Sequence, residues 1–192
     1  MKIIDCVQGS EEWFAARLGK VTGSMFAVAK GKGKTRQTYM KNLIEELRTG
    51  KPTEYAVNKY MLWGTEMEPY ARAEYEWQKQ VSVREVGFVE LNEHIGVSPD
   101  GLVDVNGAIE IKCPTLDNHN KTTGLPSRYK AQAQGVLWVT DRKWLDFVSY
   151  HPDAEKPLFC QRVYRDEAYI TELKVRIYMF VADMKAMIEE SK

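Results

Sequence analysis

Residues 98–114 constrain the fold most, because they have the pattern of a β-hairpin with charged side chains on one face. Two short apolar segments flank an Asn-Gly pair at 106–107, a dipeptide typical of tight turns. Side chains alternate between the two faces of a strand, so Glu110 and Lys112 should project to the same side. Asp100 arrives from the neighbouring strand. We therefore expect two carboxylates and an ammonium group to meet on this hairpin.

These residue types suit hydrolysis of a phosphodiester. Mg²⁺ prefers hard oxygen ligands and is held by one or two carboxylates together with substrate phosphate. Asp100, Glu110 and the backbone carbonyl of Ile111 can supply such oxygens, to Mg²⁺ or to Mn²⁺ in its place. Lys112 can orient or deprotonate the attacking water, or stabilise transition-state charge. The alternative is a surface Glu–Lys pair on an exposed strand, since Asp followed by Glu-x-Lys is a common pattern.

Three further blocks accompany the hairpin, and all four occur in a set order. They are residues 13–24 (WFAARLGKVTGS), 64–71 (GTEMEPYA) and 129–134 (YKAQAQ), the last followed by Trp138. They are similar to a W-x3-R-x-G-x2-T-x-S block, a G-x3-E helix and a Q-x-Q helix. With the hairpin, these blocks resemble the lambda exonuclease and YqaJ-type viral recombinase family, within the PD-(D/E)xK nucleases.

The resemblance implies the fold and more of the site. The fold would be α/β (α+β-like), with the restriction-endonuclease-like core of this superfamily: a mixed β-sheet flanked by helices. Glu68 would project from its helix and complete the metal ligands, whereas Glu66, two positions away, faces elsewhere. Gln132 would lie beside the active site, where it could hydrogen-bond the scissile phosphate or the attacking water. Gln134 is nearly opposite on the same helix.

The resemblance also implies a pocket for a 5′-terminal phosphate. Arg17 can bind a phosphate with two hydrogen bonds, and Ser24 and Ser98 offer hydroxyl donors. Each residue has a simpler reading when taken alone. Arg17 could pair with Glu11 or Glu12 on its helix, and Ser24 could cap a helix. Taken together, with Ser98 two residues before Asp100, the phosphate pocket is favoured.

Composition predicts one globular enzyme domain over residues 1–192, with 44% apolar and 28% charged residues. No apolar run approaches the roughly 18 residues of a membrane span, and residues 1–7 do not have the pattern of a signal peptide. The three cysteines are scattered and lack C-x2-C spacing, which indicates free thiols in a reducing compartment. We therefore expect the cytoplasm of a bacterial host cell and no iron–sulfur cluster.

The net charge is zero, but the charge is unevenly spread. Residues 1–50 contain nine Lys and Arg against five Asp and Glu, so the remainder carries the matching acidic excess. Such segregation suits a groove or channel for nucleic acid, although an ordinary fluctuation in charge gives the same numbers. The basic loop at 31–36 has two readings, a solvated connector or a contact to the DNA backbone.

Periodicity and turn signals predict the order of elements. The expected helices are 10–19, 23–30, 36–49, 56–79, 127–139 and 166–190. The expected strands are 82–91, 95–98, 101–105, 108–113, 143–150 and 159–164. Residues 114–126 are expected to form a loop or partly mobile lid.

These inferences lead to a metal-dependent 5′→3′ exonuclease that acts on linear double-stranded DNA in phage-type recombination. It would leave 3′ single-stranded tails for a single-strand annealing protein. The resemblance implies a ring-shaped homotrimer around the duplex. Two alternatives remain: an endonuclease of the same superfamily, and a catalytically silent DNA-binding recombination module. Asp100, Glu110 and Lys112 argue against the silent module, and the phosphate pocket argues against the endonuclease.

Overall fold

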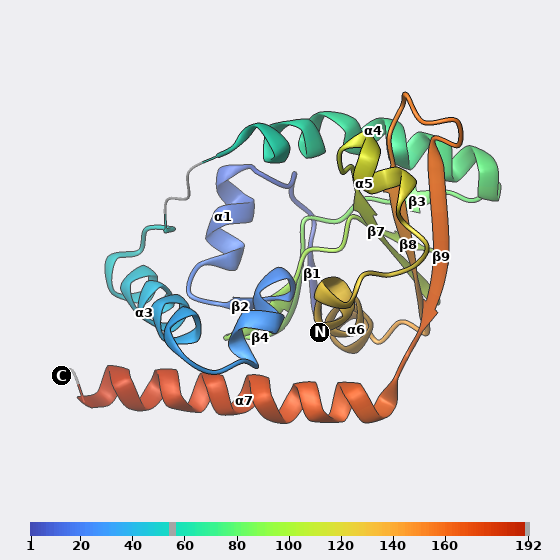
Figure 1. Ribbon diagram of the computed structural model, residues 1–192. Coiled ribbons are helices and arrows are strands. Elements are labelled where there is room, and N and C mark those ends of the chain that lie inside the picture. Colours follow the sequence, from blue (N-terminus) through green and yellow to red (C-terminus); the bar gives the residue numbers. More distant parts are fainter. Residues whose placement is uncertain (54–56, 191–192) are drawn as a thin grey trace.

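The computed structural model describes residues 1–53 and 57–190 of the chain (Figure 1). The strands form two mixed sheets, one with the order β1-β4-β5-β2 and the other with the order β3-β6-β7-β8-β9. In chain order the elements are β1 (Lys2–Ile4), α1 (Glu11–Arg17), β2 (Val21–Thr22), η1 (Gly23–Met25), α2 (Phe26–Ala29), α3 (Lys34–Thr49), α4 (Lys59–Lys79), β3 (Val83–Arg84), β4 (Phe88–Asn92), β5 (Ile95–Val97), β6 (Gly101–Val103), β7 (Gly107–Lys112), α5 (Leu116–Asn120), η2 (Ser127–Tyr129), α6 (Lys130–Thr140), β8 (Trp144–Tyr150), β9 (Leu158–Tyr164) and α7 (Glu167–Glu190).

Strand β7 lies in the middle of the five-stranded sheet. It pairs antiparallel with β6 and parallel with β8, and the crossover between β7 and β8 contains α5 and α6. Ile109 and Ile111 pack with Ala71 and Tyr75 of α4 in one apolar cluster. Ala108, on the opposite face of β7, belongs to the larger core that includes α6 and α7. The sheet is therefore enclosed by α4 on one face and α6 on the other.

A buried polar contact fixes α4 on this sheet. The hydroxyl of Tyr75 donates to Asp146 Oδ2 on β8 at 2.8 Å, and Arg162 on β9 binds the same carboxylate through two hydrogen bonds of 2.9 and 2.8 Å. Both Tyr75 and Asp146 are buried. Because a buried carboxylate without partners is costly, this arrangement specifies both the position and the rotation of α4.

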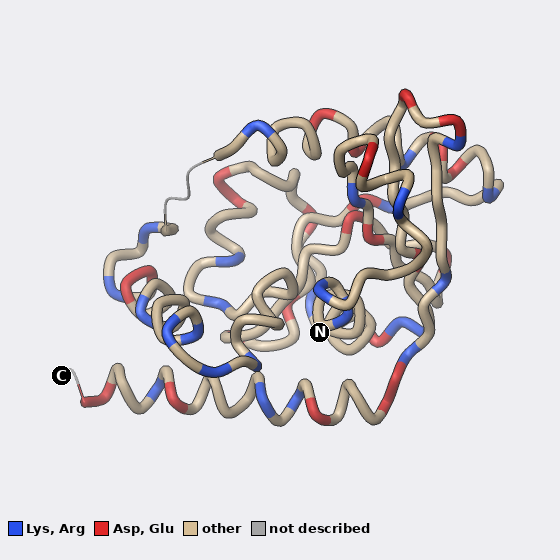
Figure 2. The backbone as a smooth tube through the Cα atoms, viewed as in Figure 1, with Lys and Arg blue, Asp and Glu red and all other residues tan. Residues whose placement is uncertain are grey.

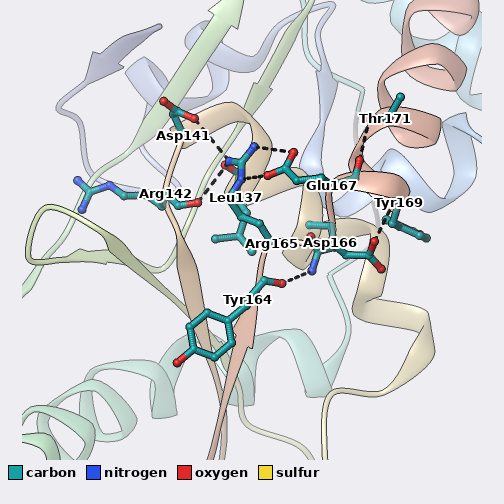
Figure 3. A network of polar contacts seen from close by, with 10 residues as sticks. Leu137, Asp141, Arg142, Tyr164, Arg165, Asp166, Glu167, Tyr169 and Thr171 are labelled. Atoms are coloured by element: carbon teal, nitrogen blue, oxygen red, sulfur yellow. Dashed lines mark hydrogen bonds and ion pairs between the residues drawn. The ribbon is translucent and has the colours of Figure 1, made fainter.

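A second polar network joins α6, β9 and α7 (Figure 3). Arg165 donates to the carbonyl of Leu137, at the end of α6, at 2.7 Å and pairs with Glu167 in the first turn of α7. Asp166 accepts a hydrogen bond from the backbone N–H of Tyr169 at 3.0 Å, as a helix cap does. These contacts therefore fix the direction of α7 at the point where the chain leaves β9. Figure 1 shows α7 on the opposite side of the molecule from α4.

The predicted mixture of sheet and helices is confirmed, and most of the elements lie near their predicted bounds. Several predictions were wrong in detail. Strand 82–91 is split into β3 and β4, which belong to different sheets, and Gly87 between them lies too close to Cys6 for a side chain. Residues 116–120 form helix α5 instead of part of a loop. The strands β1 and β2 were not predicted.

Two further expectations concern helix starts and turns. The predicted start of the helix 56–79 at residue 56 lies outside the described residues; the helix runs from Lys59, after an Asn58 cap. Gly107 was expected in the turn but is the first residue of β7. A side chain there would meet the ring of Trp144, and Asp104 adopts the left-handed conformation of the turn instead, with φ of 47°.

Figure 2 shows Lys and Arg along α3 and the loop before it. The basic residues of this part are Lys30, Lys32, Lys34, Arg36, Lys41 and Arg48. Among the residues that the structure describes, no helix is both long and apolar enough to cross a membrane.

Candidate active site

Glu110 is the most deeply buried acidic residue of the candidate site, with 1% of its surface exposed. Its Oε1 accepts hydrogen bonds from Lys112 Nζ and from Gln132 Nε2, each at 2.5 Å. Lys112 comes from the same face of β7, as the alternation of the strand predicts, and Gln132 comes from α6. The other oxygen of Glu110, Oε2, is buried and has no hydrogen-bond partner among the described residues.

Asp100 approaches the same strand from the residue just before β6. Its Oδ2 accepts a hydrogen bond from the backbone N–H of Ile111 at 2.5 Å. Burial raises the pKa of Asp100, while Lys112 and this backbone contact oppose the rise. The carboxylate is therefore held beside β7 by the main chain of that strand, and its position follows from the β6–β7 pairing.

Glu68 reaches the site from α4. Its Oε1 pairs with Arg72 Nη2 at 2.6 Å, and Arg72 Nη1 pairs with Glu85 Oε2 at 2.9 Å. Burial and the nearby Asp100 raise the pKa of Glu68 to about 7, although Arg72 opposes this. Glu66 is exposed, so the structure turns Glu68 and not Glu66 toward the site.

Lys112 is held as a cation by its neighbours. Burial alone would lower the pKa of Lys112, but Glu110 and Asp100 together hold it above its usual range. Its Nζ also lies 5.3 Å from the ring centre of Tyr129, a distance suited to a cation–π contact. The surface alternative for the Glu–Lys pair is therefore wrong: Glu110 is buried, and only about a quarter (27%) of the Lys112 side chain is exposed.

Glu110 is buried behind Lys112 and Gln132, which both bind it. Glu68, Asp100, Lys112 and Gln132 line an open pocket of about 720 Å³. Its lining contains site residues from α4, β7 and α6, together with aromatic and apolar residues at its edge. The lining residues are Ser24, Asn58, Tyr60, Met61, Gly64, Thr65, Glu68, Asp100, Ile111, Lys112, Cys113, Pro114, Arg128, Tyr129 and Gln132.

The donor set fits a hard divalent cation. Glu68, Asp100 and Glu110 present carboxylate oxygens. The buried Oε2 of Glu110 has no hydrogen-bond partner among the described residues, and a bound cation could be its partner. Within residues 1–53 and 57–190, no three Asp, Glu, His or Cys side chains are already gathered as a set of metal ligands. Oxygens of Glu68 and Glu110 are instead paired with Arg72 and Lys112.

The residues expected to bind a terminal phosphate are Arg17, Ser24 and Ser98, and Ser98 lies two residues before Asp100. Ser98 Oγ accepts hydrogen bonds from Arg17 Nη1 at 3.0 Å and from Trp13 Nε1 at 2.9 Å, and the guanidinium of Arg17 lies 4.0 Å above the Trp13 ring. Ser24 is exposed and lines the main pocket. It lies inside η1, whose cap position is Thr22, so the reading of Ser24 as a cap is wrong.

Strand pairing places Ser24 and Ser98 at the same end of two neighbouring strands. β2 and β5 are parallel neighbours, with Thr22 opposite Gly96. Ser24 and Ser98 each follow their paired residue by two positions, so both leave the small sheet at the same edge. A side chain at Gly23 would press on Val97, which indicates how closely the two segments pack.

Four further residues lie in or near the site, and two of them were not predicted from the sequence. Gln134 is buried and bridges the carbonyl of Tyr164 and the N–H of Asp166, so its amide is engaged away from the Glu110 carboxylate that Gln132 binds. Cys113 lines the pocket, and burial raises the pKa of its thiol to about 12, so it stays protonated. Sequence reasoning missed Arg72 and Tyr129. The spacing of Arg72, four residues after Glu68, was the available signal.

The mixed sheet presents Asp, Glu and Lys beside one another, and the flanking helices add a further Glu and a Gln. This arrangement defines a nuclease of the PD-(D/E)xK type. The chain belongs to the YqaJ-like viral recombinase domain family, whose model matches residues 12–143. No curated protein matches it significantly.

Solved structures agree with this assignment. LHK-Exo in complex with dAMP is 44% identical, with a TM-score of 0.89 over 95% of this chain and 96% of that chain. A second structure of LHK-Exo, an alkaline exonuclease from Laribacter hongkongensis, is also 44% identical, with a TM-score of 0.87 over 94% and 95% of the two chains. A phage-related exonuclease from Haemophilus somnus, 18% identical, shares the fold with a TM-score of 0.69 over 90% and 96%.

The raised pKa of Glu110 predicts how the metal-free protein responds to pH. Burial raises this pKa from 4.5 to about 7, with Lys112 opposing the rise and Asp100 adding to it. Between these values the folded state binds more protons than the unfolded chain, so the contribution of Glu110 to stability falls as pH rises. As pH rises from about 5 to about 8, we expect the free energy of unfolding of Glu110→Gln to increase relative to that of the wild type by on the order of 2 kcal/mol.

Urea unfolding of both proteins in EDTA measures this difference at each pH. Because the two proteins share every other titrating group, a difference that does not change with pH would contradict the expectation.

Proposed function

We propose that the protein is a metal-dependent 5′→3′ exonuclease that degrades one strand of linear double-stranded DNA from 5′-phosphorylated ends. The observation that carries the proposal is the buried Glu110 carboxylate, which binds Lys112 and Gln132 through one oxygen and leaves the other buried without a partner, next to a pocket lined by Lys112, Asp100 and Glu68. The arrangement suits a phosphodiester, whose negative charge needs a cation and fixed donors around it.

Glu68, Asp100, Glu110 and the backbone carbonyl of Ile111 would hold the ion, with Mg²⁺ the expected metal and Mn²⁺ a substitute. When bound, such an ion lowers the pKa of water and neutralises charge on phosphate. Lys112 would orient or deprotonate the attacking water, or stabilise charge on the reacting phosphate. Gln132 can donate its amide to a phosphate oxygen or orient the same water.

The choice of DNA end is proposed to depend on Arg17, Ser24 and Ser98. The Arg17–Ser98 contact holds a guanidinium beside the hydroxyl two residues before Asp100, which suits binding of a terminal phosphate near the cleavage site. LHK-Exo, the relative at 44% identity, was crystallised with dAMP. A nucleoside monophosphate is the product that a 5′→3′ exonuclease releases, which supports the proposal.

The product would be a duplex with a 3′ single-stranded tail, the substrate of a single-strand annealing protein in phage-type homologous recombination. The YqaJ-like viral recombinase domain supports this setting. An endonuclease of the same superfamily is the second candidate, and an internal cutter would not need a 5′-phosphate pocket. The intact set of Asp100, Glu110 and Lys112 makes a catalytically silent module the weakest candidate.

We further propose that three copies form a ring around the duplex. A chain with zero net charge should hold DNA weakly as a monomer, since nonspecific affinity depends on neutralising several phosphates. A closed ring would keep the enzyme on its substrate by topology, with the basic part around α3 toward the channel. Light scattering should give the mass of three subunits. One subunit, together with processive digestion, would contradict the ring.

The metal site can be tested by Asp100→Ala, Glu110→Gln and Lys112→Ala. The first two should abolish Mn²⁺ binding in calorimetry and lower cleavage by on the order of 10³-fold, because a ligand is lost. Lys112→Ala should still bind Mn²⁺ but lose cleavage to a similar degree. Glu66→Gln, on the exposed side of α4, is the matched control and should behave as wild type. Full activity in Glu110→Gln would end the nuclease proposal.

End selection can be tested by Arg17→Ala on duplexes with and without 5′ phosphates. Loss of one charge-assisted contact should slow digestion of phosphorylated ends about 10- to 150-fold. Ends with a 5′ hydroxyl should be poor substrates of the wild type and little affected by the substitution. If the wild type digests both ends equally, the phosphate pocket is wrong and the endonuclease becomes the better candidate.

A further inference from the structure

We propose that Arg72, anchored by Glu85, is a positioning residue that holds Glu68 in the orientation in which it binds the metal. The inference rests on the proposed function, because it concerns the same ion. It assigns roles to two residues outside the Asp100–Lys112 constellation and outside the pocket lining. Arg72 would act through Glu68 and would not contact the substrate.

The contacts form a chain from the surface to the site. Glu85, in the connection between β3 and β4, pairs with Arg72 Nη1 at 2.9 Å, and Arg72 Nη2 pairs with Glu68 Oε1 at 2.6 Å. The guanidinium therefore joins two carboxylates from separate parts of the chain. Since Arg72 engages one oxygen of Glu68, the second oxygen remains available to an ion.

Burial separates this pair from an ordinary helix-surface pair. The Arg72 side chain is 12% exposed, and its Nε is buried with no hydrogen-bond partner among the described residues. The Arg48–Glu45 pair on α3, also within one helical turn, is 74% and 54% exposed. Exposed pairs of that kind contribute little. A buried guanidinium is costly unless its charge is paired, and Glu68 and the more exposed Glu85 supply the partners of Arg72.

The helix itself explains why Glu68 needs an anchor. Pro69 lies inside α4, directly after Glu68, and has no N–H to donate to the carbonyl of Thr65. The turn that carries Glu68 therefore lacks one of the backbone hydrogen bonds that a regular helix would have there. Ala71 and Tyr75 fix the later part of α4 on the sheet, and Arg72 extends that fixed part back to Glu68.

The charges are also compatible with a cation nearby. Arg72 alone would repel a divalent ion, but Glu85 offsets its charge, so the group of Glu68, Arg72 and Glu85 keeps one net negative charge. Partners of this kind, which orient a ligand without touching the metal, typically change metal affinity about 10- to 100-fold when removed.

Calorimetric titration of the full-length protein with Mn²⁺, without DNA, tests the proposal. Arg72→Gln should bind Mn²⁺ about 10- to 100-fold more weakly. Arg72→Lys should recover part of the loss, because an ammonium group cannot hold both carboxylates in a planar fork. Glu85→Gln should weaken binding less than Arg72→Gln. Arg84→Gln, which removes an exposed arginine that pairs with Asp5, is the matched control and should bind as wild type.

The double variant Arg72→Gln/Glu85→Gln makes the test specific. If Glu85 acts through Arg72, the double variant binds Mn²⁺ no more weakly than Arg72→Gln alone. Cleavage by Arg72→Gln should also return toward the wild-type rate at raised Mn²⁺, a rescue that general damage to the fold would not permit. Wild-type or tighter Mn²⁺ binding by Arg72→Gln, or additive effects in the double variant, would overturn the inference.

Failure of the proposed function has a different outcome. In that case the wild type would not bind Mn²⁺, or it would bind Mn²⁺ as well as Glu110→Gln does. If the wild type binds Mn²⁺ through Glu110 and Arg72→Gln leaves that binding unchanged, the positioning role alone is wrong.

Discussion

The site depends on a carboxylate and an ammonium group buried side by side on strand β7. Moving either charge out of water costs several kcal/mol, which a close pair with further hydrogen bonds can offset. Lys112 and Gln132 satisfy one oxygen of Glu110, but the other has no partner, and Asp100 and Glu68 add negative charge nearby. The site therefore holds more carboxylate than its neighbours balance, which is the condition in which a divalent cation is bound.

Packing on both faces of the sheet makes this concentration of charge possible. Tyr75 and Asp146 fix α4 on one face, and α6 packs on the other. Glu68 precedes Tyr75 by seven residues, roughly two helical turns or about 10 Å along the axis, so it reaches beyond the packed part of the helix to the end of β7. Gln132 reaches the same place from α6. The carboxylates therefore converge near the C-terminal end of β7, beside the pocket that Glu68, Asp100 and Lys112 line.

The small sheet adds a second constraint. β5 ends just before Ser98, and β6 begins just after Asp100, so residues 98–100 connect the two sheets. The group that Arg17 contacts and the carboxylate beside β7 therefore lie on one short segment. A shift in the small sheet would move both, and would thereby link the proposed recognition of a DNA end to the chemistry proposed for the site.

The sequence by itself determined the hairpin, the shared face of Glu110 and Lys112 and the helical periods of α4, α6 and α7, because these follow from local alternation and spacing. The four ordered blocks identified the family, now confirmed, and with it the expectation that Glu68 and Gln132 turn toward β7. Sequence could not divide residues 82–91 between two sheets, since both parts have the same strand pattern. It also missed β1 and β2, which are too short for a periodic signal and exist through pairing with β4 and β5. Only the tertiary structure decided that Arg17 contacts Ser98 rather than remaining a helix-surface group, and that Arg72 joins Glu68 to Glu85. The spacing of Glu68 and Arg72 on one helix is a local signal, but the contacts of Arg17 with Ser98 and of Arg72 with Glu85 join different elements of the chain. Their physical cause is the packing of whole elements, which no local pattern contains.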